Sequence, residues 1–193
     1  MQRIIPLAGV EMPASVALPT IPRTPEGLAM GAIPGWRMLA DPAHVTATSV
    51  RNRARPNAMM PANGALSMGT MAGRPALTGT NTTPRVTVTT AMNPEAWTAF
   101  FTLQTPRLGA SGGRELIRAN DIDNDGIGPR VTIRTNGTLA IFENQSDRLR
   151  LQGPVIPDNA PCLIMATSST RDGLRLYLDG ALVAANPDDR RPL

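Results

Sequence analysis

Three aspartates at alternate positions form the most suggestive run for chemistry in the sequence, Asp121-Ile-Asp-Asn-Asp-Gly126. Alternating carboxylates followed by glycine let a short loop wrap its oxygens around Ca²⁺, an ion that prefers oxygen ligands. We therefore predict a Ca²⁺ loop whose ligands are Asp121, Asp123, Asp125 and the main-chain carbonyl of Ile127. The alternative is a solvated acidic turn that is held by hydrogen bonds between its side chains and its own backbone.

This run does not form an EF-hand. An EF-hand loop requires a bidentate glutamate at its twelfth position, where this chain has Thr132, and Pro129 interrupts the usual continuation. The flanking segments also have the pattern of strands, whereas an EF-hand lies between two helices. A Ca²⁺ ion in this loop would be structural, and the sequence requires no other cofactor.

Groups that could catalyse a reaction are sparse. A glycosidase needs a pair of carboxylates that flank the scissile bond. The five glutamates are scattered along the chain, at Glu11, Glu26, Glu95, Glu115 and Glu143. His44 is the single histidine, and no Gly-x-Ser-x-Gly elbow accompanies it. We expect that the protein is not an enzyme and that it has no catalytic residues.

The basic residues do not predict nucleic-acid binding. All 19 of them are arginines, and the formal net charge is only +4. The densest run, Arg51-Asn-Arg-Ala-Arg55, has no interleaved aromatic residues on which bases could stack. This run is either a solvated loop or a contact for an acidic partner. Cys162 is the single cysteine and lies in an apolar run, so we expect a buried thiol and no intrachain disulfide.

Residues 1–35 have the composition of an extended arm. Prolines recur through this segment and exclude a helix, yet its apolar content is higher than a free linker would have. An apolar arm must lie on a surface, and we favour a neighbouring subunit over the chain's own domain. Glu11 and the nearby prolines break any signal-peptide helix, so we expect synthesis in a host cytoplasm without export. No run approaches the roughly 20 apolar residues of a membrane span.

The rest of the chain, residues 36–193, has the pattern of an all-β domain. Residues 36–84 are irregular with short strand candidates, and from Arg85 onward alternating and apolar runs predict strands every 8–12 residues, which favours an antiparallel β-sandwich or jelly roll. The predicted strands are 85–90, 96–104, 115–120, 130–135, 138–143, 148–152, 162–168, 173–178 and 181–184. Asn136-Gly137 and Asp179-Gly180 are typical of two-residue hairpin turns of type I′.

The C-terminal half resembles the laminin-G-like, concanavalin-A-like jelly rolls. The run Gly173-Leu-Arg-Leu-Tyr-Leu-Asp-Gly-Ala-Leu-Val183 is similar to that family's strand, turn and return strand, and Asn136-Gly-Thr-Leu-Ala-Ile141 is similar to another of its hairpins. Gly73-Arg-Pro-Ala-Leu-Thr-Gly79 resembles the entry strand of bacterial and phage members. The resemblance covers about residues 70–185. Family members usually continue for further strands, so it implies a sheet that is incomplete or is completed by another chain.

Two functions are compatible with these features. The first is a structural or attachment protein of a bacteriophage-like virion, either a head decoration protein, a head fibre or a tail component. It would contact other virion proteins through the arm and form a homo-oligomer or symmetric assembly. The second is a carbohydrate-binding, lectin-type module of an adhesin, with host surface polysaccharide as its ligand. Sugar sites use exposed aromatic residues, which are scarce in this sequence. We expect neither nucleic acid nor membrane as a partner.

Overall fold

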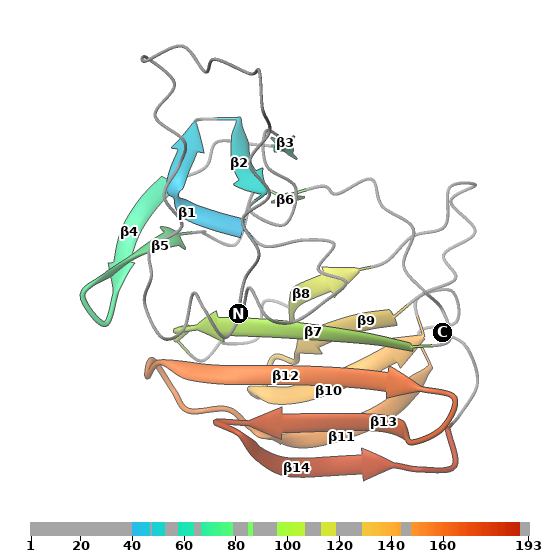
Figure 1. Cartoon of the computed structure of the whole chain (residues 1–193). Coiled ribbons are helices and arrows are strands. Elements are labelled where there is room, and N and C mark those ends of the chain that lie inside the picture. The colour runs from blue at the N-terminus through green and yellow to red at the C-terminus, as the bar shows by residue number, and fades with distance from the viewer. Residues whose placement is uncertain are drawn as a thin grey trace, which may run out of the picture.

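The computed structural model of the chain describes residues 40–46, 48–52, 58–63, 67–78, 85–86, 96–106, 113–118, 129–143 and 148–189. Every regular element in these residues is a β-strand, and all strand pairs are antiparallel (Figure 1). None of the described residues belongs to a helix that is long and apolar enough to cross a membrane. The predicted all-β class is confirmed for the described part of the chain.

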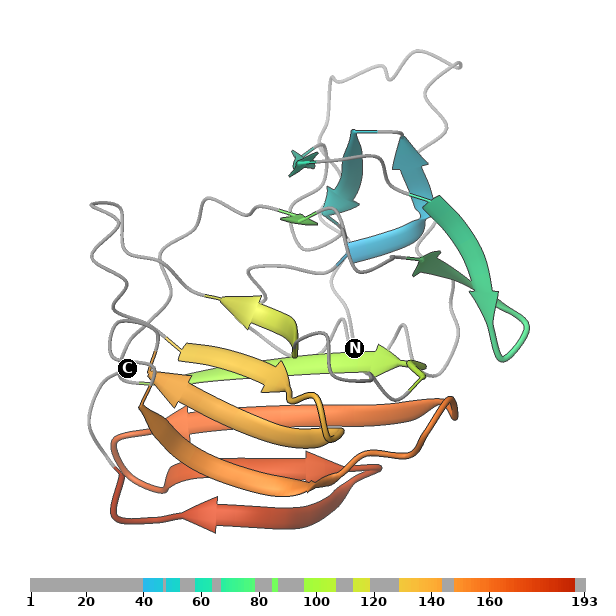
Figure 2. The ribbon, with the colours of Figure 1, turned by 180° about the vertical axis from the view of Figure 1, so that it is seen from behind.

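Two four-stranded sheets make up the C-terminal part. The front sheet contains, in spatial order, β14 (Ala181–Asn186), β13 (Gly173–Leu178), β12 (Cys162–Ser169) and β7 (Ala96–Leu103). The back sheet contains β11 (Leu149–Val155), β10 (Thr138–Glu143), β9 (Pro129–Ile133) and β8 (Arg114–Arg118). The front sheet faces the reader in Figure 1 and the back sheet does so in Figure 2, so the two sheets form the layers of a β-sandwich.

The core lies between these layers and is mostly aliphatic. Successive side chains of a strand point to opposite faces, and every second residue of β12 is accordingly buried. The buried cluster consists of Trp97, Val131, Ile133, Leu139, Ile141, Leu151, Ile156, Cys162, Ile164, Ala166, Leu174 and Leu176. Each fully buried aliphatic side chain in it stabilises the fold by about 1.5–3 kcal/mol. Branched aliphatic residues of the predicted strands thus make up most of this cluster, and Trp97 is its buried aromatic residue.

The chain changes sheet twice. It begins the sandwich in the front sheet with β7, forms the back sheet as the meander β8 to β11, and returns to the front sheet for the meander β12 to β14. The neighbouring strands β7 and β12 are therefore separated by a long stretch of sequence. β7 pairs with β12 along its whole length, from Cys162 opposite Leu103 to Ser169 opposite Ala96.

Both predicted hairpins are confirmed, but only one has the predicted turn. Asp179 and Gly180 have φ values of 51° and 85°, as a type I′ turn between β13 and β14 requires. In the other hairpin Gly137 alone has a positive φ, of 81°. Its N–H donates to the carbonyl of Arg134 at 2.8 Å, and the N–H of Arg134 donates to the carbonyl of Thr138 at 2.8 Å.

The type I′ prediction for Asn136-Gly137 is therefore wrong. The loop has three residues, with a type I turn followed by a left-handed glycine that forms a bulge. Asn136 remains important because its side-chain oxygen accepts a hydrogen bond from the N–H of Thr138 at 3.0 Å. That bond stabilises the turn without a positive φ at the asparagine.

The N-terminal strands form separate sheets beside the sandwich (Figure 1). A further sheet contains β1 (Ala40–Thr46), β2 (Ser49–Asn52), β3 (Ala58–Asn63) and β6 (Arg85–Val86), and β4 (Ser67–Met71) pairs with β5 (Arg74–Thr78). Val50, Met60 and Asn52 are buried there, whereas Met59 and Met68 are exposed. The predicted entry strand at 73–79 corresponds to β5, whose one pairing partner is β4. The predicted arm, residues 1–35, lies outside the described residues.

Candidate interaction surface

The outer face of the front sheet carries a continuous row of large apolar side chains. The strand register places Phe100 opposite Met165, Met165 opposite Tyr177, and Tyr177 opposite Leu182. The row therefore crosses all four strands, one residue per strand. We call Phe100, Met165, Tyr177 and Leu182 the apolar row.

The row points away from the core because of strand alternation. Its sequence neighbours on the four strands, including Phe101, Ile164 and Leu176, belong to the core or pack against it. Leu182 is 54% exposed and Phe100 is 42% exposed, while Met165 and Tyr177 are partly covered. Leu163, on the same face of β12, is 40% exposed and extends the apolar surface toward one end of the strands.

Charge is almost absent from this face. In the four described strands of the front sheet, Arg175 is the one charged residue. Its guanidinium lies 3.3 Å from the carboxylate of Asp172, which precedes β13. The cross-strand neighbours of Arg175 on this face are small or carry hydroxyls. They are Thr98, Thr167 and Ala185. The surface is thus apolar with hydroxyl-bearing margins.

The back sheet has a different chemical character. A buried ion pair joins Arg150 of β11 to Asp189, with Glu143 3.6 Å from the same guanidinium. The hydrogen bonds that Arg150 donates to the carboxylate of Asp189 are the main cause that raises the pKa of Arg150 above its usual value. The guanidinium of Arg130 stacks 4.9 Å from the ring centroid of Phe142 and lies 3.8 Å from Glu115. Arg150 and Arg130 therefore have carboxylate partners within the chain itself.

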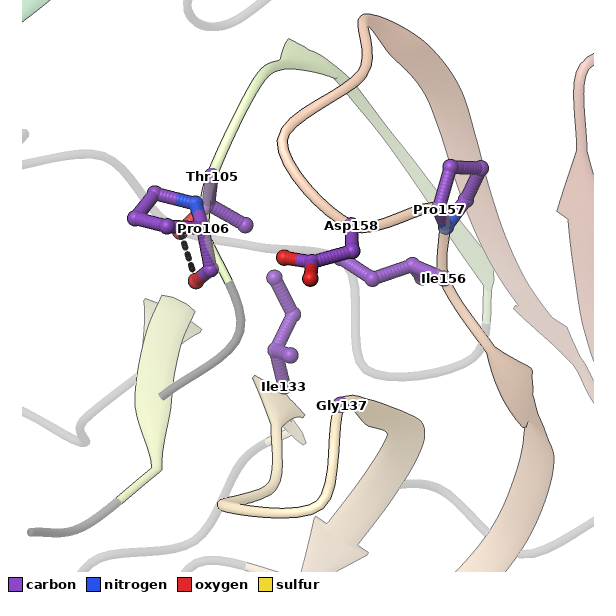
Figure 3. Close-up of a pocket in the computed structure, with 7 residues that line it drawn as sticks. All are labelled: Thr105, Pro106, Ile133, Gly137, Ile156, Pro157 and Asp158. Carbon is purple, nitrogen blue, oxygen red and sulfur yellow. Dashed lines mark hydrogen bonds between the residues drawn. The ribbon is translucent and has the colours of Figure 1, made fainter. Parts of the chain in front are cut away.

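Two hollows accompany these surfaces. A polar hollow of about 240 Å³ lies at the edge of the sandwich and is lined by Arg148, Leu149, Arg150, Asn186, Asp188 and Asp189. A second cavity, of about 10 Å³, has room for about one water molecule. Figure 3 shows the residues that line it, Thr105, Pro106, Ile133, Gly137, Ile156, Pro157 and Asp158, where three loops meet at one end of the sandwich.

Hydrogen bonds fix the loops around the small cavity. The N–H of Ile156 donates to the carbonyl of Gly137 at 3.0 Å, and the N–H of Asn159 donates to the carbonyl of Thr105 at 2.9 Å. These bonds connect the β9–β10 turn and the segment after β7 to the crossover between the sheets. The cavity is therefore a structural junction with room for no more than a water-sized ligand.

The predicted Ca²⁺ ligands Asp121, Asp123, Asp125 and Ile127 lie outside the described residues. The described residues contain no group of three or more His, Cys, Asp or Glu side chains that could hold a metal ion, and this finding does not extend to that loop. The predicted burial of Cys162 is confirmed, and burial raises the pKa of its thiol. Of the basic run, Arg51 lies in β2, and Arg53 and Arg55 lie outside the described residues.

Sequence reasoning missed the apolar row as a unit. The apolar run 162–168 predicts a strand, but by itself it does not indicate which of its residues face outward. The useful signal was the alternation of β12, where Leu163 and Met165 fall between the core positions Cys162, Ile164 and Ala166. The row itself depends on registers between distant strands, which no local pattern contains.

Comparisons of the chain with protein-family models, with curated proteins and with solved structures found no match.

Proposed function

We propose that this chain is a non-catalytic structural or attachment protein of a bacteriophage-like virion, as a head decoration protein, a head fibre or a tail component. The observation that supports this proposal best is the exposed apolar row on a rigid sheet. Large exposed apolar patches with polar margins are typical of protein contact surfaces. A virion component that is present in many copies has such surfaces because it must pack against its neighbours.

The sequence adds two further supports to the proposal. Residues 1–35 combine apolar side chains with recurrent prolines, which suits an arm that docks on other virion proteins. The resemblance to laminin-G-like, concanavalin-A-like jelly rolls, a fold used by phage structural proteins, suits the sandwich. A structural Ca²⁺ ion held by Asp121, Asp123, Asp125 and the carbonyl of Ile127 would add rigidity to the loop between β8 and β9.

The experiment is a search for the chain in purified particles from the organism that encodes it. Particles are separated on a density gradient, and the chain is quantified by mass spectrometry against the major capsid protein. The proposal predicts cosedimentation at a fixed ratio and labelling by an antibody at one defined position on the particle. Absence of the chain from full particles, while it is abundant in the lysate, would contradict the proposal.

A carbohydrate-binding module is the second candidate. Phe100 and Tyr177 both lie on the outer face of the front sheet, where aromatic rings can stack against sugar rings. A glycan array with the full chain separates the two functions. A lectin would bind a defined set of glycans, and Tyr177→Ala would abolish that binding while the melting temperature changed little. A structural component would give no glycan signal above background.

A further inference from the structure

The outer face of the front sheet is large enough to form an interface by itself. Neighbouring strands lie about 4.8 Å apart and each residue advances about 3.3 Å along its strand. Four strands of six to eight residues therefore present about 440 Å² of flat area per copy. Two such faces together cover about 890 Å² before side-chain relief is added, and that relief brings the buried surface to the lower limit of specific protein interfaces, about 1,000 Å².

We propose that this face is the contact surface of a homodimer, in which a second copy of the chain packs its own front sheet against it. The apolar row would become the centre of a four-layered assembly, with the two front sheets about 10 Å apart as in other stacked sheets. This inference does not rest on the virion proposal, because the pairing follows from the face alone.

The face is compatible with itself under twofold symmetry. A twofold axis parallel to the strands and between the sheets places β12 of one copy over β13 of the other. Met165 then faces Tyr177, and Phe100 faces Leu182, so every member of the apolar row meets another apolar side chain. Pairs of an aromatic ring and an aliphatic chain pack well at such contacts.

Charge also favours a second copy over a charged partner. Under the same symmetry Arg175 faces Thr167, its cross-strand neighbour, and not the Arg175 of the other copy. Each Arg175 has Asp172 3.3 Å away, so it brings its counter-charge into the contact. A charged protein or nucleic acid would find almost nothing on this face to pair with. Because no like charges face each other across this contact, the apolar contacts supply most of the free energy of association.

The test is sedimentation velocity of the full chain over a range of concentrations, with two matched variants. Leu182→Arg places a charge in the apolar row, and Val155→Arg makes the same change at a residue of the back sheet that is 46% exposed. We expect a wild-type dimer whose dissociation constant rises by at least about 100-fold in Leu182→Arg, because both copies lose a buried leucine contact. Val155→Arg should leave the dissociation constant within about twofold.

A second variant and a fold check keep the test decisive. Leu163→Arg, at the margin of the same face, should weaken the dimer less than Leu182→Arg does, and circular dichroism must show that all variants keep the wild-type β-sheet signal. A wild type that stays monomeric at micromolar concentrations would overturn the proposal, as would an oligomer that neither front-sheet variant weakens. Binding of a synthetic peptide of residues 1–35 to a wild type that stays monomeric, with loss of that binding in Leu182→Arg, would overturn it in favour of the arm as occupant, and the same result with an oligosaccharide would do so in favour of a sugar.

Discussion

The two sheets of the sandwich share one core but have different outer faces. The strands of the front sheet contain a single charged residue, Arg175, whereas those of the back sheet contain six: Arg114, Glu115, Arg118, Arg130, Glu143 and Arg150. Five of these charges, all except Arg114, find partners within the chain, in ion pairs and in the Arg130–Phe142 stack. The apolar residues of the front sheet remain partly exposed to solvent. The comparison teaches that the charges of the back sheet are mostly paired within the monomer, whereas the front sheet presents a row of apolar side chains that suits a partner.

The largest expected effect is loss of the buried ion pair on the back sheet. The side chains of Arg150 and Asp189 are 2% and 5% exposed, so Asp189→Ala removes the hydrogen-bonded counter-charge of a buried guanidinium and leaves Glu143 3.6 Å away. We expect the free energy of unfolding to fall by about 3–5 kcal/mol, measured by urea denaturation. Asp188 precedes Asp189 and is exposed, so it supplies the control. Asp188→Ala should lower the free energy of unfolding by less than about 0.5 kcal/mol. Equal effects of the two substitutions would show that the pair is not a buried anchor.

Calcium should act through the predicted loop, which connects β8 to β9 of the back sheet. An ion bound only to the folded state stabilises it by about 2.7 kcal/mol at 100 times its dissociation constant, which raises the melting temperature by several degrees. Asp123→Asn should weaken this response, since it removes one charge from the ligand set. Differential scanning fluorimetry with Ca²⁺ and with EDTA checks the prediction. A response that Mg²⁺ or NaCl reproduces would identify simple screening by a solvated acidic turn.

The stability of the back-sheet hairpin should depend much more on Gly137 than on Thr135 of the same turn. Gly137 has a φ of 81°, so Gly137→Val forces a β-branched residue into the left-handed region. We expect a loss of about 1–3 kcal/mol in thermal or urea unfolding. Thr135→Val, at an exposed position of the same turn without a positive φ, should change the stability by less than about 0.5 kcal/mol. A large effect at Thr135 would require a different turn geometry.

The inner side of the front sheet should show a dependence on alkaline pH. Burial raises the pKa of Cys162 above its unfolded value of 9.0, so the unfolded chain releases this proton first. The corresponding stability is fully present below pH 9.0 and falls as the pH rises toward the folded pKa, by at most about 1.4 kcal/mol per pH unit. Urea unfolding between neutral and alkaline pH measures this slope. Cys162→Ala should remove its contribution, and an identical slope in both proteins would refute the assignment.

Much of the sandwich was predictable from local sequence, because its strands alternate and its turns carry glycine. The predicted strand 138–143 coincides with β10, and 162–168 differs from β12 by one residue. The predicted strand 148–152 was too short, since β11 continues through Gly153 and Pro154 to Val155. Pro154 has no N–H to donate to a neighbouring strand, and β11 tolerates it because β11 is an edge strand.

The interaction surface was not predictable in the same way. It depends on the pairing of β7 with β12, whose residues Phe100 and Met165 are distant in sequence. Alternation assigns each strand two faces but does not say which strand lies beside which. The type of the Asn136-Gly137 turn also depends on where the flanking strands stop, because Thr135, which the predicted strand 130–135 included, joins the loop and lengthens it from two residues to three.

The smallest expected effect concerns Arg175, the single charge of the front-sheet strands. Its pair with Asp172 is exposed, with side chains 37% and 46% accessible, so Arg175→Gln should change the free energy of unfolding by less than about 1 kcal/mol. The contrast with Asp189→Ala sharpens the comparison, since both substitutions break one ion pair and only the buried pair should matter. Urea unfolding at low and high salt measures both, and any small difference between Arg175→Gln and the wild type should vanish at high salt because exposed pairs are screened. A loss as large as that of Asp189→Ala would mean that Arg175 is enclosed by another part of the chain, and the front face would then be no open surface at that end.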